Sequence, residues 1–182
     1  MKKAQTTPVK STSVKSENPM RRYKITKVVL SCGGVDKELE KSKKLLEILS
    51  SRKPQVVASQ KRIPAFKVNP GLQVGTSVTI RGEEGIVLLR RLLGAVDNTL
   101  KRKQASLGQI SFGIKEYIEI PGVEYQRDIG IRGLNVTVVF ARPGLRSKIR
   151  KIKRAQSIPQ KQYVSPEEII KYMEEQFKTV FK

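Results

Sequence analysis

The side chains of this sequence that could do chemistry are mostly cations, and they gather near its C-terminal end. Residues 142–161 hold eight basic side chains and no acidic one. Guanidinium and ammonium groups bind phosphate oxygens through charge-assisted hydrogen bonds. A solvated charge run is the alternative, but basic blocks without acids usually serve as interaction segments. The eight residues are Arg142, Arg146, Lys148, Arg150, Lys151, Lys153, Arg154 and Lys161.

The whole chain is also strongly basic. Its 182 residues include 37 Lys and Arg against 16 Asp and Glu, which gives a formal net charge of +21. Self-repulsion of this size destabilises a compact state unless a polyanion absorbs it. A membrane-surface helix needs an apolar stripe, and Gln156, Ser157 and Pro159 interrupt any such stripe. Nucleic acid is therefore the expected partner, with no membrane, and a basic membrane-surface or chromatin protein is the alternative.

The residue types that most enzymes use are scarce. The chain has no histidine and one cysteine, Cys32, which excludes Ser-His-Asp and Cys-His catalysis and leaves too few ligands for a zinc site. Cys32 ends an apolar run, so we expect a small buried side chain rather than a nucleophile. An RNA-modifying enzyme that uses lysine or carboxylate would need a convergent pocket, which the pattern does not indicate. We expect no catalytic residue, no cofactor and no metal ion.

Hydrophobic periodicity predicts the elements that must position these groups. Apolar runs of strand type alternate with two amphipathic helices, and a helix start at Ser165 follows the basic segment. The second helix is expected to turn Ile86, Leu89, Leu93 and Val96 inward. The expected strands are 21–32, 55–59, 74–81, 109–114 and 134–140, and the expected helices are 36–51, one that begins at 83, and one that begins at 166.

This order predicts an α+β fold, a mostly antiparallel sheet with two helices packed on one face. We divide the chain into three parts. Residues 1–19 are expected to be a disordered basic tail, residues 20–141 an α+β RNA-binding core, and residues 142–182 a basic arm with a C-terminal helix.

Three of the strands alternate apolar and small polar residues, which places each set on one face of a sheet. The apolar set can bury the helices, and the other set lacks the aromatic residues of a base-stacking platform. A plain solvated face is the alternative, but such faces usually carry long charged side chains. The pattern favours recognition of the shape and backbone of folded RNA. The second set consists of Gly75, Ser77, Thr79, Arg81, Gln109, Ser111, Gly113, Asn135, Thr137 and Val139.

Several ordered segments resemble the L five family of large-subunit ribosomal proteins in its archaeal and eukaryotic form. The resemblance extends from about residue 18 to residue 177. It implies the helix-covered sheet described above, a place in the central protuberance of the large subunit, and attachment of 5S rRNA there. The segments are Asn18-Pro19-Met20-Arg21, Ala65-Phe66-Lys67, Val78-Thr79-Ile80-Arg81-Gly82-Glu83, Ser111-Phe112-Gly113-Ile114-Lys115-Glu116, Ile129-Gly130-Ile131-Arg132-Gly133-Leu134 and Arg142-Pro143-Gly144.

Three positions of the family are associated with 5S rRNA, and the chain keeps one of them. Thr79 matches, whereas Ser31 stands where the family has Asn and Arg52 where it has Gln. Ser31 retains a hydroxyl, and Arg52 could still hold a phosphate. The residues expected to bind rRNA are Ser31, Arg52, Ser77, Thr79, Arg81, Gln109, Ser111, Arg146, Lys148, Arg150, Lys151, Lys153 and Arg154.

The resemblance also implies contacts beyond 5S rRNA. The basic loop after residue 60 would reach toward the elbow of P-site tRNA, and another surface would join the bridge to a protein of the small-subunit head. Further expected partners are large-subunit rRNA and neighbouring large-subunit proteins, and the expected location is cytoplasmic and ribosome-bound. The loop residues expected to contact tRNA are Lys61, Arg62, Phe66, Lys67, Val68, Asn69, Pro70, Gly71, Leu72 and Gln73.

Overall fold

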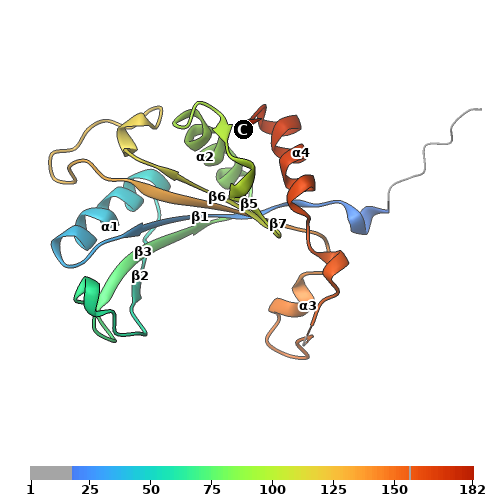
Figure 1. The fold of residues 1–182 in the computed structure, drawn as a ribbon, viewed down its shortest axis with the longest axis horizontal. Coiled ribbons are helices and arrows are strands. Elements are labelled where there is room, and N and C mark those ends of the chain that lie inside the picture. The colour runs from blue at the N-terminus through green and yellow to red at the C-terminus, as the bar shows by residue number, and fades with distance from the viewer. Residues whose placement is uncertain (1–17, 156) are drawn as a thin grey trace, which may run out of the picture.

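The computed structural model describes residues 18–155 and 157–182. The tail expected over residues 1–19 lies outside the described residues except for its last two positions. The expected α+β class is confirmed: one mostly antiparallel sheet carries helices on one face (Figure 1). The helices are α1 (Lys37–Ser50), α2 (Glu83–Gly94), α3 (Arg146–Ile149) and α4 (Pro166–Phe177).

The main sheet has six strands in the order β2-β3-β1-β7-β6-β5, and every neighbouring pair is antiparallel. The two central strands, β1 and β7, therefore come from opposite ends of the chain. A separate parallel pair joins β4 (Thr99–Leu100) to β8 (Val180–Phe181). The strands of the main sheet are β1 (Lys24–Gly33), β2 (Gln55–Ala58), β3 (Gln73–Ile80), β5 (Ala105–Ser106), β6 (Gln109–Ile114) and β7 (Leu134–Ala141).

The core lies between the sheet and its helices. Period-two alternation turns one side of each central strand inward, because successive strand side chains point to opposite faces. Val28 and Leu30 of β1, Val136 and Val138 of β7, and Leu46 of α1 are all fully buried in it. Cys32 is buried as expected, and desolvation raises the pKa of its thiol to about 11. The described residues contain no helix long and apolar enough to cross a membrane.

Helix α4 adds a third helix to the two expected on this face. Its residues Ile169 and Met173 are completely buried in the same core cluster as the strands. Its Tyr172 ring meets Phe140 of β7 edge-on, with 5.5 Å between the ring centroids. Ser165 caps the helix in a reciprocal capping box with Glu168, and Pro166 occupies the first turn. The helix that follows the basic segment is therefore part of the central packing.

The inner face of α2 differs in part from the prediction. Leu89 and Leu93 are buried as expected, but Ile86 and Val96 are only half-buried. Leu88 and Leu92 are buried instead. The apolar stripe of α2 is wider than its contact with the sheet, so periodicity alone could not select the residues that touch it.

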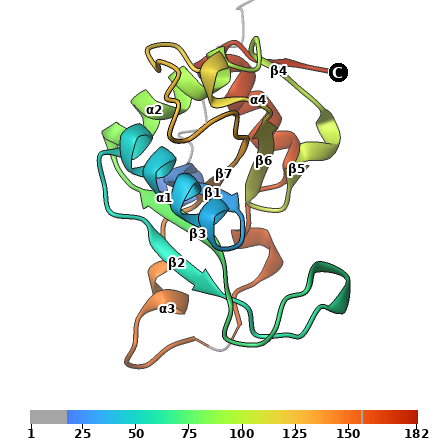
Figure 2. The ribbon, with the colours of Figure 1, turned by 90° about the vertical axis from the view of Figure 1, so that its left-hand side faces the viewer.

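Two projections extend from the sheet on the side opposite α2 and α4 (Figures 1 and 2). One is the hairpin loop, residues 59–72, which joins β2 to β3. The other is the arm, residues 142–161, which leaves β7 and returns to α4 and includes α3. Between them lies the second face of the sheet.

Candidate nucleic-acid interface

The second face of the sheet, here called the polar face, is built in rows that run across the strands. Strand register sets these rows, because antiparallel partners lie directly opposite each other. One row places Ser31 of β1 between Ser77 of β3 and Asn135 of β7. The next row places Val29 between Thr79 and Thr137. The first row runs Gln55, Ser77, Ser31, Asn135, Gly113, and the second runs Thr79, Val29, Thr137, Ser111.

The side chains of these rows are short, uncharged and accessible. Ser111 and Asn135 are exposed, and Ser31, Ser77 and Thr79 are half-buried. The Ser111 and Thr137 hydroxyls lie 3.2 Å apart across β6 and β7 and share a hydrogen bond. None of the nine residues in the two rows is acidic or aromatic. The predicted alternation is thus confirmed, and the face lets a sugar–phosphate backbone approach closely.

The structure brings most of the sheet residues predicted to bind rRNA onto this face. The two rows contain four of them, Ser31, Ser77, Thr79 and Ser111. Gln109 lies opposite Val139 in the next row. Arg81 follows the end of β3 and is exposed.

Arg52 is separated from this group. It follows α1 and pairs with Glu84 in the first turn of α2, on the helix-covered side. The structure therefore gives Arg52 an intramolecular partner and does not place it beside Ser31 or Thr79.

Register also adds two residues that sequence reasoning missed. Gln55 of β2 lies opposite Ser77 and extends the first row to the edge of the sheet. Lys27 of β1 lies opposite Val139, in line with Gln109, and provides a cation on the face itself. The spacing of Lys27, Val29 and Ser31 is a period-two signal that could have identified Lys27. Gln55 carries no such signal, because its position depends on pairing with a strand distant in sequence.

The hairpin loop has internal order. Ile63 and Val68 exchange two backbone hydrogen bonds of 2.9 and 3.1 Å and enclose a 3-10 turn at Pro64–Phe66. Phe66 projects with 75% of its surface exposed, whereas Val68 is only 6% exposed. The buried Val68 side chain therefore packs within the loop and offers little surface to a partner. The other loop residues predicted to contact tRNA are exposed except Leu72, which is half-buried.

The arm presents its cations outward. Its backbone turns back on itself, because the Ala155 amide donates to the Ser147 carbonyl at 3.1 Å and Arg150 Nε donates to the Lys153 carbonyl at 2.6 Å. Ile152 is 79% exposed at the far end. All six predicted arm residues are exposed: Arg146, Lys148, Arg150, Lys151, Lys153 and Arg154.

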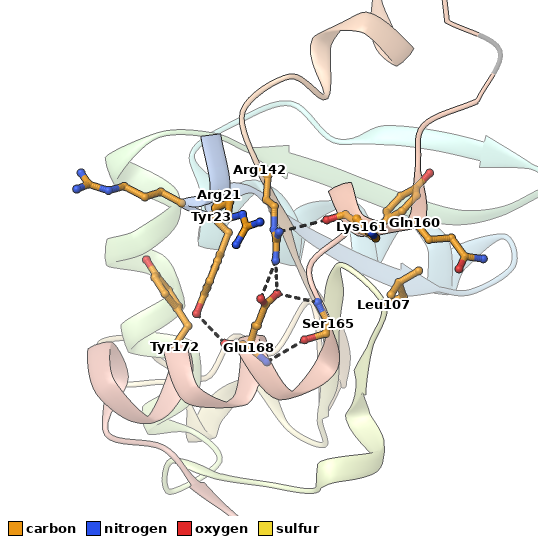
Figure 3. A pocket seen from close by; sticks show the side chains of 11 residues that line it. Arg21, Tyr23, Leu107, Arg142, Gln160, Lys161, Ser165, Glu168 and Tyr172 are labelled. Atoms are coloured by element: carbon orange, nitrogen blue, oxygen red, sulfur yellow. Dashed lines mark hydrogen bonds and ion pairs between the residues drawn. The ribbon is translucent and has the colours of Figure 1, made fainter. Parts of the chain in front are cut away.

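The base of the arm is closed by an ion pair (Figure 3). Arg142 donates from Nη2 to both carboxylate oxygens of Glu168 at 2.6 Å and from Nη1 to the Lys161 carbonyl at 3.2 Å. The Arg142 side chain is 14% exposed and that of Glu168 36%. Burial alone would raise the pKa of Glu168, but the hydrogen bonds from Arg142 and the Ser165 amide outweigh it and leave that pKa lowered. Arg142 thus joins the two ends of the arm to each other and fixes them to α4 through Glu168.

Together these parts make an accessible surface of polar groups bordered by cations. An open face of hydroxyls and amides can hydrogen-bond to ribose and phosphate, and the cations at its margins can neutralise phosphate charge. In the described ranges, no three His, Cys, Asp or Glu side chains gather as metal ligands.

Comparisons with known proteins match the sequence of this chain to a family. The model of the C-terminus of the ribosomal L5 family matches residues 73–161. The large ribosomal subunit protein uL5 of Nanoarchaeum equitans is 37% identical over 163 residues, which cover 88% of this chain and 96% of the relative. The protein of the same name from Sulfolobus acidocaldarius is 37% identical over 166 residues, 90% of this chain and 93% of the relative. Since this identity extends over most of both chains, the protein belongs to the family of large ribosomal subunit protein uL5.

Proposed function

We propose that this protein binds 5S rRNA and helps attach it to the central protuberance of the large ribosomal subunit. As a member of the uL5 family it is a structural ribosomal protein and not an enzyme. A ribosome-bound location follows from the same membership. The proposed binding of 5S rRNA is supported chiefly by one observation, the accessible polar face, whose two rows contain no acidic side chain.

The polar face favours recognition of RNA by shape. Its rows offer hydroxyl and amide groups that can pair with 2′-hydroxyls and phosphates. Small residues such as Gly113, Ser31 and Ser77 leave space for a ribonucleotide backbone to lie close to the sheet. The two rows have no ring for a base to stack on, so folded RNA suits this face better than single strands.

The arm and the margin of the sheet supply the electrostatic part of the binding. Arg81 follows the end of β3 and is exposed, and Lys27 lies within β1. The arm, which carries six exposed cations, extends on the side of the sheet opposite α2 and α4. Each phosphate that these cations neutralise releases counterions, so the affinity falls steeply with salt.

The hairpin loop serves a second RNA, the P-site tRNA. It projects beyond the sheet, is closed by its own hydrogen bonds, and exposes Phe66 next to Lys67. An aromatic ring beside a cation suits contact with an unpaired part of a folded RNA. The separation of the loop from the rows of the polar face allows both RNAs to bind at once.

Residues 115–133 differ from these surfaces and suit a protein partner. They expose Tyr125 and Ile131, and their charges nearly balance. The four acids are Glu116, Glu119, Glu124 and Asp128, and the three bases are Lys115, Arg127 and Arg132. The segment is held in place, because the Tyr117 hydroxyl accepts from the Gln126 amide at 2.9 Å. We assign the bridge to the small-subunit head to this segment, because exposed aromatic and apolar side chains without a basic excess suit a protein partner better than rRNA.

The direct test compares two polyanions. Filter binding at physiological salt should show tight binding to folded 5S rRNA and much weaker binding to duplex DNA of equal length. Equal affinity for both would overturn the assignment to 5S rRNA. Stripping the protein from purified large subunits should release 5S rRNA, and its full retention would contradict the proposed attachment.

A further inference from the structure

A hollow beside the base of the arm has no part in the function proposed so far. Its volume is about 1300 Å³, and it lies between the start of β1, the β5–β6 turn, the returning end of the arm and α4 (Figure 3). We propose that it takes an unpaired nucleotide extruded from the bound RNA, with the base against its tyrosines and the phosphates on its cations. This inference rests on the proposed function, because the RNA must first lie on the polar face and the arm.

The chemistry of the lining supports a nucleotide. Tyr23, Tyr163 and Tyr172 contribute aromatic rings, and Leu107 is an exposed apolar side chain at the margin. Unpaired bases in protein–RNA complexes are commonly held against such rings. The polar face has no comparable ring in its two rows, so a base of the bound RNA would find in this hollow a stacking surface that the rows lack.

The charge of the lining also fits a nucleotide. Arg21, Arg22 and Lys161 are exposed and have no ion-pair partner among the described residues. The acid in the wall, Glu168, is neutralised by the two hydrogen bonds from Arg142. The net charge that faces a ligand is therefore positive, which suits phosphate.

The wall is held rigidly before any ligand binds. The Tyr23 hydroxyl donates to the Glu168 carbonyl at 3.1 Å, and its ring centroid lies 5.7 Å from that of Tyr172. Lys148 of the arm donates to the Tyr163 hydroxyl at 2.9 Å. Groups fixed in this way lose little conformational entropy on binding. Because Lys148 and Lys161 belong to the arm, RNA on the arm would be adjacent to the hollow.

The test uses the full chain and three probes. The first is a fully paired RNA hairpin, the second is the same hairpin with one bulged 2-aminopurine, and the third is 2-aminopurine riboside monophosphate. We expect the bulged hairpin to bind about 5- to 100-fold more tightly than the paired one, because this is the gain in affinity that one base stacked on an aromatic ring provides. The fluorescence of the bulged 2-aminopurine should be quenched when the hairpin binds.

Substitutions at Tyr163 locate the stacking. Tyr163→Leu should abolish the quenching and the preference for the bulge while leaving the affinity for the paired hairpin unchanged. Tyr163→Phe should keep both, because it retains the ring. Tyr125→Leu removes an exposed tyrosine outside the hollow and is the matched control. Thermal unfolding by circular dichroism verifies that each variant is folded.

The possible failures are distinct. If the wild-type chain binds neither the hairpins nor folded 5S rRNA, the proposed function itself is overturned. If it binds folded 5S rRNA but neither hairpin, only the nucleotide site is overturned. If it binds both hairpins equally, or if Tyr163→Leu keeps the quenching, only the nucleotide site is overturned. Equal quenching of the free monophosphate at the same concentration would make the hollow a mononucleotide site instead. Full competition by a polyglutamate peptide would reassign it to an acidic protein segment.

Discussion

Arg81 is the residue that most directly tests the polar face. It is exposed at the end of β3, next to Thr79 on the same side of that strand. Arg81→Glu replaces an attraction to phosphate with a repulsion, and hydrogen bonds to charged groups are worth roughly 1.5–3 kcal/mol. We expect the dissociation constant for 5S rRNA in filter binding to rise about 10- to 100-fold.

The control for Arg81 lies on the other side of the molecule. Lys171→Glu makes the same charge reversal at an exposed position of α4. It should change the affinity far less. An unchanged affinity in Arg81→Glu would remove this end of the face from the site.

Glu168 makes stability depend on pH. Its pKa in the folded protein is below the usual value of 4.5, because the hydrogen bonds from Arg142 and Ser165 outweigh the effect of burial. The stabilisation is therefore present at neutral pH and is lost as the pH falls below about 4.5 towards the lowered value. Glu168→Gln should reduce the free energy of unfolding at pH 7 by about 1–3 kcal/mol.

The pH dependence distinguishes loss of the Arg142–Glu168 ion pair from general unfolding of the protein in acid. Urea unfolding at a series of pH values from 7 downwards should show that the difference in free energy of unfolding between wild type and Glu168→Gln is largest at pH 7 and shrinks as the pH falls below about 4.5. The exposed neighbour offers the control, since Glu167→Gln should have little effect at any of these pH values. A difference that stays constant as the pH falls below about 4.5 would show that the ion pair is not its cause.

At the scale of elements, we propose that the cations of the arm contribute to RNA binding and not to the stability of the fold. Replacing its six exposed cations with Gln should leave the free energy of unfolding within about 1 kcal/mol. The slope of log affinity for 5S rRNA against log salt should flatten by about four to five, since each lost phosphate contact reduces it by about 0.7–0.9. The six are Arg146, Lys148, Arg150, Lys151, Lys153 and Arg154.

A control with the same change in net charge distinguishes a contact from a general field. It neutralises six exposed lysines outside the arm and should flatten the slope far less. If both sets flattened it equally, net charge and not the arm would govern the binding. The six are Lys37, Lys41, Lys44, Lys103, Lys171 and Lys182.

The hairpin loop is expected to act independently of the sheet. Phe66 is exposed and belongs to a loop closed by its own hydrogen bonds. Phe66→Ala should therefore leave the affinity for 5S rRNA and the free energy of unfolding unchanged, the latter within about 0.5 kcal/mol. Reconstituted large subunits with this variant should bind P-site tRNA more weakly. A loss of 5S rRNA binding would contradict the proposed division between loop and sheet.

For the molecule as a whole, the sequence alone predicted which residues share a face of the sheet, but not which residues lie next to each other on neighbouring strands. Alternation placed Ser77, Thr79 and Ser111 on one side, because the period of a strand is a local property. The row that joins Gln55 to Ser31 depends on register between distant strands, which no local pattern contains.

The same limit explains the surroundings of residues that the sequence could not predict. Arg52 pairs with Glu84, and Val68 is buried by the turn around Phe66. The packing of α4 onto Phe140 is equally a tertiary contact. The hollow with its three tyrosines joins segments from residue 21 to residue 172, so it could not be predicted from spacing.

The pairing of β1 with β7 at the centre of the sheet has a consequence for biosynthesis. The 100 residues between Gly33 and Leu134 must leave the translating ribosome before these strands can meet. At about 5–20 residues per second this takes about 5–20 s, during which the inner edge of β1 lacks its partner. An unpaired strand edge is a site of aggregation. The nascent chain therefore has an interval of vulnerability in which a chaperone would be of most use.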